Sequence, residues 1–270
     1  MRADKPSVLL LQRVLDCSRP GILTDIDGTI SGIAPSPDAA FVEPDARDAL
    51  RELSQRLALT GAVTGRAAND ARKLVGIDEL VYSGNHGMEL WRDGELQRSP
   101  LALRYEPEIT RVLESIRSTL QFDGMLIENK VLTASIHYRG VADPEKVEAA
   151  ILVELERLIA PGALNITRGR KVIEVRPPVE LSKGTSVAEL AAEYELDGLI
   201  YLGDDVTDVD AFRALTKLRS EKGLEFHSVG VRNDPTPQQV IDNADAMVDG
   251  VQGVIELLQQ ALQQFDRKES

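Results

Sequence analysis

Short apolar segments alternate with helix-like segments at both ends of this chain, and that alternation limits its fold more than any other feature. Most of the apolar segments, which are two to six residues long, are followed by a polar turn and then by apolar positions at helical spacing. Strands that alternate with helices predict a parallel sheet with crossover helices. The predicted strands lie at residues 22–24, 62–63, 80–82, 199–202 and 226–231, and the predicted helices lie at 44–57, 67–74, 183–194, 206–215 and 254–265.

The middle of the chain follows a different pattern, in which strands are grouped instead of alternating with helices. A hairpin is expected around residues 93–94, and two helices are expected at 106–120 and from Pro144 onward. The strands expected between and after these helices are at 125–128, 131–138, 164–167 and 172–175. We therefore expect an α/β core domain from residues 1–100 and 181–270, interrupted by an inserted α+β domain at 101–180, which suits 270 residues at roughly 150 per domain.

Acidic residues follow two of the predicted core strands directly. Asp25 and Asp27 come after the first strand, with Gly28 allowing a sharp turn, and a second cluster of Asp204, Asp205 and Asp208 follows strand 199–202. Ligands of open α/β sheets bind at the carboxyl ends of the strands. Carboxylates brought together there repel one another, and a divalent cation relieves this; an all-oxygen set suits Mg²⁺.

Helix capping and calcium binding are two simpler explanations of these acids. Any single Asp at a strand end is explained as a helix cap, but two Asp-rich clusters in the same position are not. A calcium loop of the EF-hand type fails on spacing, because Ile30 and Ser36 occupy the positions of its glycine and its last glutamate.

Thr64 and Lys183 offer hydrogen-bond donors and a positive charge, which together can bind a phosphoryl group. Thr64 enters a turn before a predicted helix, where a hydroxyl and backbone N–H groups can hold an anion. Lys183 opens the helix after the insert and offers a positive charge. Alone, each is an ordinary cap or surface charge; together with the acidic clusters they indicate a phosphate site.

Four segments occur in order and resemble the motifs of the haloacid dehalogenase (HAD) superfamily of phosphohydrolases: residues 25–29, 63–66, 181–187 and 203–208. The resemblance implies a Rossmann-like parallel-sheet core with an inserted α+β cap domain. It also implies that Asp25 is the nucleophile, forming an aspartyl-phosphate, and that Asp27 is the general acid and base.

The same resemblance implies the remaining parts of the phosphoryl site. Thr64, Gly65, Arg66 and Lys183 would bind the phosphoryl group. Mg²⁺ would be bound by Asp25, by Asp27 through its backbone carbonyl and by Asp204, with support from Asp205 and Asp208. Val209 departs from the pattern, because the family commonly has another acid there.

Within the insert and just before it, further segments resemble the trehalose-6-phosphate phosphatase family. This implies that substrate contacts come from Asn85, His86, Glu128, Lys130, Arg139, Lys171, Glu174 and Arg176. Alternating acids, bases and amides suit a ligand with several hydroxyl groups. For His86 a structural role in its turn is the alternative, and for Arg168 and Arg170 the alternative is a solvated strand face.

Net charge and apolar content limit the partners. The formal net charge is −13, which disfavours nucleic acid and anionic membranes. Residues 164–183 are the exception, with five basic residues against two acidic ones. A lone Cys17 excludes an internal disulfide, and no apolar segment is long enough for a signal peptide or a membrane span, so we expect a cytoplasmic protein. We also expect a monomer.

The expected activity is Mg²⁺-dependent hydrolysis of trehalose 6-phosphate. The alternatives are related enzymes acting on sucrose phosphate, on glucosyl or mannosyl glycerate phosphate or on hexose phosphates, a phosphomutase, and a catalytically silent sugar-phosphate sensor. The presence of both Asp25 and Asp27 argues against a sensor, which does not need a nucleophile and an acid.

Overall fold

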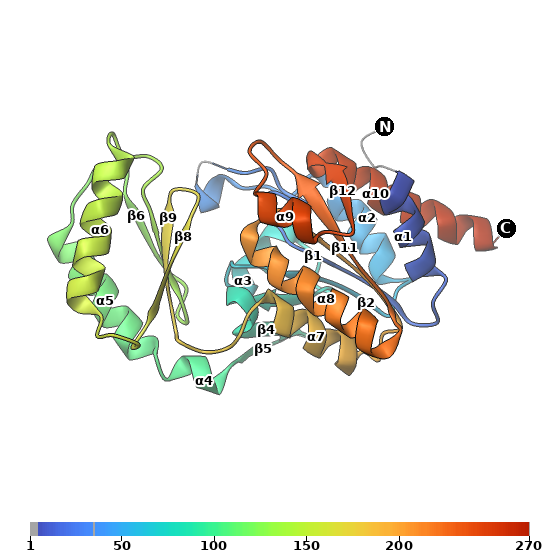
Figure 1. The fold of residues 1–270 in the computed structure, drawn as a ribbon, viewed down its shortest axis with the longest axis horizontal. Helices are drawn as coiled ribbons and strands as arrows, with labels where there is room; N and C mark the ends of the chain where they lie inside the picture. The colour runs from blue at the N-terminus through green and yellow to red at the C-terminus, as the bar shows by residue number, and fades with distance from the viewer. Residues whose placement is uncertain (1–4, 35, 270) are drawn as a thin grey trace. The chain divides into compact units, whose positions relative to one another are not determined.

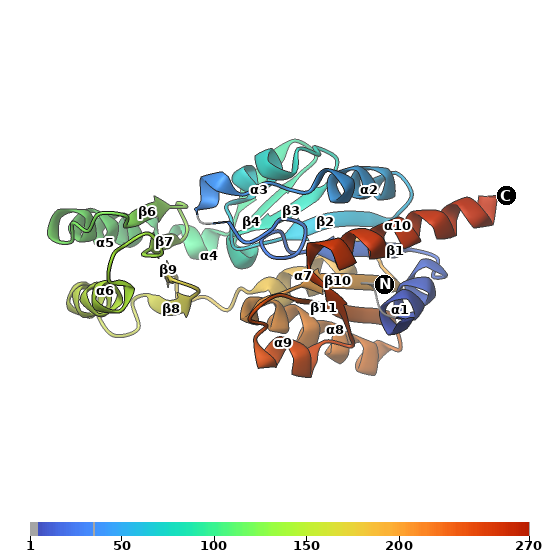
Figure 2. The same cartoon turned by 90° about the horizontal axis from the view of Figure 1, so that it is seen from above.

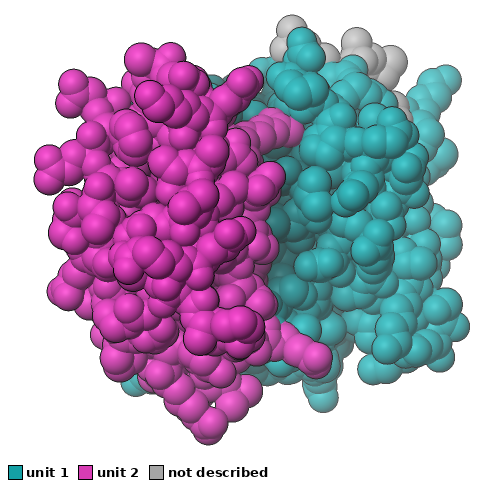
Figure 3. Space-filling view, turned by 60° about the vertical axis from the view of Figure 1, so that its left-hand side comes forward, with its two compact units in different colours: residues 1–97, 181–270 teal, residues 98–180 magenta. Residues whose placement is uncertain are grey.

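The computed structural model of the chain describes residues 5–34 and 36–269. It divides into two compact units, Met1–Gln97 with Leu181–Ser270 and Arg98–Glu180 (Figure 3). None of the helices in the described ranges combines the length and the apolar character needed to span a bilayer.

The first unit is built on one eight-stranded sheet, whose strands run side by side in Figure 2. The six strands from β12 to β3 are parallel, and β4 is antiparallel to β3. The order across the sheet is β12 (Ala246–Asp249), β11 (Glu225–Arg232), β10 (Gly198–Gly203), β1 (Pro20–Thr24), β2 (Leu59–Val63), β3 (Val81–Gly84), β4 (Glu89–Arg92) and β5 (Glu95–Arg98). The expected mixed α/β class with a parallel sheet is confirmed.

Helices cover both faces of this sheet, which explains why its central strands are apolar throughout. In β1, Ile22 packs into the core on one face and the next residue, Leu23, packs into the core on the other. Figure 1 shows α2 and α10 on one side of the sheet and α7 and α8 on the other. The first face has α1 (Lys5–Leu15), α2 (Pro44–Ser54), α3 (Ala68–Val75) and α10 (Gly250–Glu269), and the second has α7 (Lys183–Glu193), α8 (Val209–Lys222) and α9 (Gln238–Asn243).

The second unit has a four-stranded antiparallel sheet in the order β6-β7-β9-β8. One face of the sheet packs against helices through a separate apolar core that includes Ile136, Ile173 and Val175. Because side chains alternate along a strand, the residues between these project from the opposite face, and they are polar. The elements are α4 (Pro100–Leu103), α5 (Glu106–Thr119), β6 (Leu126–Asn129), β7 (Ala134–His137), α6 (Pro144–Leu158), β8 (Asn165–Gly169) and β9 (Val172–Arg176).

Parts of the first unit differ from the expected pattern, among them the short helix α9, which was not predicted. Helix α1 was not anticipated, although Leu11 and Val14 on its inner face are buried. Strand β12 has four residues and was not predicted. The helix expected at 206–215 begins as a single 3-10 turn, η3 (Val206–Asp208), before α8, which ends at Gly223 in the left-handed conformation.

Candidate active site

Asp25 lies at the carboxyl end of β1, in the middle of the parallel sheet. Its backbone N–H donates to the carbonyl of Leu202 in the neighbouring strand at 2.8 Å, which fixes the residue at the sheet edge. Gly28 then turns the chain at φ +86°, and a Cβ there would lie 2.2 Å from Asp204 Oδ2. Only glycine lets the first acidic segment approach the second this closely.

Asp208 is the residue that organises the second acidic segment. Its Oδ2 accepts hydrogen bonds from the backbone N–H groups of Asp204 and Asp205 at 3.0 and 2.9 Å. Its Oδ1 accepts from the Tyr201 hydroxyl at 2.6 Å and from Lys183 Nζ at 2.8 Å. Both oxygens of this fully buried carboxylate are therefore engaged within the protein.

Lys183 joins the two acidic segments from the first turn of α7, which is capped by Ser182. Its Nζ lies 2.9 Å from Asp25 Oδ1 and 2.8 Å from Asp208 Oδ1, and its side chain is 3 % exposed. Burial lowers the pKa of Lys183, but the charges of Asp208 and Asp25 outweigh that effect and raise it, so the ammonium stays protonated. Lys183 is the positive centre of the site.

The charges of this cluster fit a divalent cation. Asp25, Asp204 and Asp208 each present an oxygen within 4.8 Å of the others, and a single ammonium leaves two of the three negative charges uncompensated. Burial, with the nearby Asp208, raises the pKa of Asp204 to about 7. Burial raises the pKa of Asp25 as well, although Lys183 opposes the rise. A divalent cation would stabilise the charged form of both carboxylates, which burial and the neighbouring acids disfavour.

One atom points to where such a cation would bind. Asp204 Oδ1 is buried and has no hydrogen-bond partner among the described residues. An uncompensated buried carboxylate oxygen is costly unless something binds it. Because Asp208 is fully engaged, Asp25 and Asp204 fit best as side-chain ligands. The carboxylates of Asp27 and Asp205 lie outside the three-residue group.

Arg66 binds the carboxylate of Asp27. Arg66 Nε lies 2.6 Å from Asp27 Oδ2, and Nη2 lies 2.7 Å from Oδ1, so the pair is bidentate. The sequence motif predicts Arg66 as a phosphate ligand, and the structure gives it this partner, which lies 39 residues away.

The turn after β2 is supported by the turn after β3. Thr64 is buried, and its Oγ1 accepts from the Arg66 N–H at 3.3 Å. The backbone N–H groups of Asn85 and His86 donate to the carbonyls of Arg66 and Thr64. A Cβ on Gly65 would lie 2.7 Å from His86 Nε2, so the imidazole packs directly on Gly65. Asn85 and His86 are both buried and shape this turn.

The polar face of the second unit's sheet brings together three of the predicted sugar contacts. Lys130 Nζ lies 3.9 Å from Glu128 Oε2 and 3.7 Å from Glu174 Oε1. His137 Nε2 lies 3.2 Å from Glu128 Oε2, and the Ser135 hydroxyl lies 3.5 Å from Glu174 Oε1. His137 and Ser135 were missed, although their alternation with buried Ile136 on β7 was a usable signal.

The remaining predicted contacts of this unit are at the ends of its strands. Arg139 donates to the carbonyl of Arg170 at 3.0 Å, beside the exposed Lys171 in the turn between β8 and β9. Arg176 ends β9 and is partly buried. Arg168 lies 3.7 Å from Glu148 of α6, which places it on the helix side of the sheet, away from Glu174.

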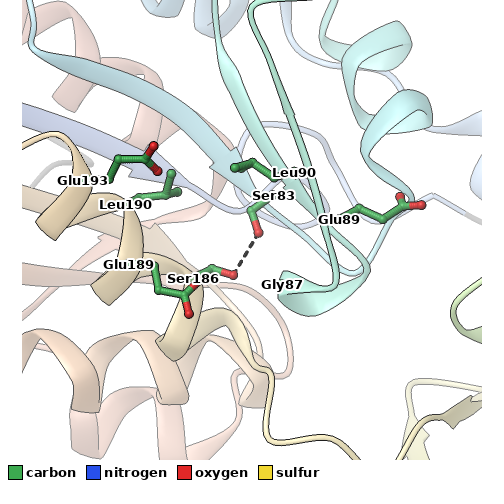
Figure 4. A pocket seen from close by; sticks show the side chains of 8 residues that line it. All are labelled: Ser83, Gly87, Glu89, Leu90, Ser186, Glu189, Leu190 and Glu193. Carbon is green, nitrogen blue, oxygen red and sulfur yellow. Dashed lines mark hydrogen bonds between the residues drawn. The ribbon is translucent and has the colours of Figure 1, made fainter. Parts of the chain in front are cut away.

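A small hollow of about 60 Å³ lies beside α7 in the first unit (Figure 4). Ser83 and Ser186 meet in it through a 2.9 Å hydrogen bond, and Glu89, which also lines it, accepts from the Ala68 N–H and so caps α3. It contains none of the predicted catalytic or metal residues, and we assign it no role in the reaction. Its lining is Ser83, Gly87, Glu89, Leu90, Ser186, Glu189, Leu190 and Glu193.

Comparison with solved structures identifies the type of fold. A haloacid dehalogenase-like hydrolase from Bacteroides thetaiotaomicron superposes with a TM-score of 0.64 at 14% identity, over 90% of this chain and 99% of that chain. The C-terminal domain of the C. albicans trehalose-6-phosphate phosphatase superposes with a TM-score of 0.78 at 23% identity, over 97% of this chain and 98% of that chain. These likenesses establish a haloacid dehalogenase-like fold.

The family follows from the sequence. The family model described as trehalose-phosphatase matches residues 23–244, so the chain belongs to the trehalose-phosphatase family. The Mycobacterium tuberculosis trehalose-phosphate phosphatase is 35% identical over 218 residues, which cover 77% of this chain and 54% of that protein. A probable trehalose-phosphate phosphatase of Oryza sativa is 34% identical, over 74% of this chain and 56% of that protein. The chain spans about half the length of the curated relatives it matches.

Proposed function

We propose that this protein is a phosphatase that hydrolyses trehalose 6-phosphate to trehalose and phosphate with Mg²⁺ as cofactor. The observation that carries the proposal is the buried ion-pair network in which Lys183 bridges Asp25 and Asp208 at the carboxyl ends of β1 and β10. Family membership supplies the substrate. The two units are proposed to be the core and the inserted cap domain, in a monomeric cytoplasmic enzyme.

In the first half of the proposed reaction, an Asp25 carboxylate oxygen attacks phosphorus and the bond from phosphorus to the sugar oxygen breaks. Asp27 donates its proton to that leaving oxygen. Arg66 holds Asp27 through one contact to each oxygen, so each oxygen keeps a second lone pair at which a proton can be held. In the second half, Asp27 takes a proton from a water molecule that attacks phosphorus, and phosphate and the free Asp25 carboxylate are released.

The positive charges of the site let an anionic substrate approach a carboxylate nucleophile. Lys183 contributes one charge at a fixed position, and the buried Thr64 hydroxyl in the turn before Gly65 can donate to a phosphoryl oxygen. Asp25 and Asp204 would hold Mg²⁺. When bound, Mg²⁺ supplies charge neutralisation at the phosphoryl oxygens and the nucleophile.

The polar face of the inserted unit suits a disaccharide. Glu128 and Glu174 offer acceptors and Lys130 offers donors, all on one sheet face and at distances longer than direct hydrogen bonds between them. Sugar hydroxyls both donate and accept, so this set matches them. Arg139, Lys171 and Arg176 add positive charge at the ends of the same strands.

The test is phosphate release across a panel of trehalose 6-phosphate, sucrose 6-phosphate, glucosyl glycerate phosphate and glucose 6-phosphate. We expect trehalose 6-phosphate to give the highest kcat/KM, Asp25→Asn to lose at least about 10³-fold in kcat, and EDTA to abolish turnover until Mg²⁺ is restored. Asp48→Asn, a change in an exposed surface ion pair, is the matched control and should be fully active. Preference for another sugar phosphate would reject the substrate, and an active Asp25→Asn would reject the nucleophile.

A further inference from the structure

Asn233 connects the two acidic segments and belongs to neither. It follows β11, and its side-chain Nδ2 donates to Asp204 Oδ2 at 3.0 Å and to the backbone carbonyl of Gly28 at 2.9 Å. Gly28 is 205 residues away in the sequence. None of the sequence motifs includes this residue.

These two bonds fix how the Asp204 carboxylate is rotated. A primary amide has two N–H donors on one nitrogen, and here one goes to each acidic segment. On the other side the carboxylate lies against Gly28, where a Cβ would be 2.2 Å from Oδ2. Asp204 Oδ2 is therefore held between an amide and the backbone.

The consequence concerns the other oxygen of the same carboxylate. With Oδ2 bound to Asn233, Asp204 Oδ1 is buried and without a hydrogen-bond partner in the part of the chain that the structure describes. Asp204 also belongs to the group whose oxygens meet within 4.8 Å. An oxygen that is dehydrated, unpaired and fixed in direction is pre-organised for a cation.

We infer that Asn233 is a positioning residue for the divalent cation: by binding Asp204 Oδ2 and the Gly28 carbonyl together, it presents Asp204 Oδ1 to the metal. This inference rests on the metal dependence proposed above. A neutral donor suits the task, because the cluster already has two uncompensated negative charges and a further carboxylate would add a third. Removing such an outer partner of a metal ligand typically weakens metal binding by about 10- to 100-fold.

The test measures cation binding without turnover. Metal-free full-length protein is titrated with MgCl₂ alone by calorimetry, as wild type and as Asn233→Leu, which keeps the side-chain size and removes both donors. Asn243→Leu is the matched control, since Asn243 is also half-buried and makes two side-chain hydrogen bonds, to Arg213 and to the Gln239 carbonyl, away from the acidic segments. We expect a Kd for Mg²⁺ at least about 10-fold higher in Asn233→Leu and unchanged in Asn243→Leu.

A second readout separates positioning from catalysis. In Asn233→Leu the Mg²⁺ concentration for half-maximal hydrolysis should rise by the same factor as the Kd, while kcat at saturating Mg²⁺ stays within a few-fold of wild type. If the leucine variant does not fold, judged by circular dichroism, Asn233→Thr retains one donor and should show a smaller rise in Kd.

The outcomes are distinguishable. A Kd within twofold of wild type in the folded variant overturns the role of Asn233 and leaves the proposed function standing. A wild-type protein that binds no Mg²⁺ or Mn²⁺ overturns the metal dependence itself, and this inference with it.

Discussion

The two units each contain a buried lysine between two carboxylates, and the two lysines are held differently. In the first unit Lys183 lies within 2.9 Å of both Asp25 and Asp208, and its side chain is 3 % exposed. In the second unit Lys130 is 7 % exposed, but its Nζ is 3.9 Å from Glu128 and 3.7 Å from Glu174. An ammonium and two carboxylates lie within direct hydrogen-bonding distance in the first unit and at longer distances from one another in the second.

The difference follows from what each region is proposed to bind. At the phosphoryl site the charges must already be in position when the reaction begins, because reorganising them would add to the barrier. On the sheet face of the second unit, the lysine lies 3.7 to 3.9 Å from the two glutamates, and side chains of these types donate to and accept from sugar hydroxyls.

The largest expected effect comes from removing each lysine in turn. Lys183→Met leaves buried carboxylates without their cation, so the metal-free protein should lose about 3–5 kcal/mol in free energy of unfolding and nearly all activity. Lys130→Met leaves two glutamates that water can reach, and should cost about 1 kcal/mol or less. Urea denaturation of both variants measures the contrast, and equal losses would contradict the distinction between the two networks.

A variant of Arg66 tests whether this side chain orients the proton donor, Asp27, or binds the phosphoryl group. If Arg66 orients Asp27, Arg66→Met should lower kcat/KM for trehalose 6-phosphate by about 100-fold. The kcat/KM for p-nitrophenyl phosphate should fall far less, because p-nitrophenolate leaves without needing a proton. Parallel losses on both substrates, with raised KM, would favour the phosphate-binding role that the motif predicts. Arg51→Met, which breaks a surface pair with Asp48, is the control.

The stability of the metal-free protein should depend on pH through Asp204. Its pKa is raised to about 7 in the folded chain and is near 3.8 in the unfolded chain. Between these values the folded state binds more protons, so the free energy of unfolding should fall as pH rises, by about 2 kcal/mol from pH 5 to pH 7. Asp204→Asn should flatten the pH dependence measured by urea denaturation. A slope unchanged in the variant would show that another group titrates.

The smallest effect is expected on the recognition face. Glu128→Gln removes an acceptor from the group around Lys130, and should raise KM for trehalose 6-phosphate by about 10-fold without changing kcat/KM for p-nitrophenyl phosphate. Glu156→Gln, at an exposed position of α6, is the matched control. If both substrates were affected equally, Glu128 would belong with the catalytic residues and the contrast between the two units would fail.

Local signals in the sequence predicted most of the fold. Parallel strands such as β1 and β10 are apolar throughout, and the acids that follow them were placed correctly because a strand end is visible as a change from apolar to polar. Helix α1 was missed although Leu11 and Val14 lie at helical spacing, and its burial depends on contacts with α10 and the sheet. Asn233 and Tyr201 were missed because nothing beside them in the chain reveals their partners.

The sequence by itself determined the fold class and the positions of the carboxylates, since periodicity, strand ends and glycine turns depend on neighbours a few residues away. The family follows from the match of residues 23–244 to the trehalose-phosphatase family model. Only the tertiary structure decided which polar and charged side chains pair with one another. Arg66 pairs with Asp27, Lys183 with Asp25 and Asp208, and Asn233 with Asp204, all across the sheet edge. Each of these pairs joins residues that are far apart in the chain and about 3 Å apart in space. They come this close only when the strands have assembled into the sheet in their final order.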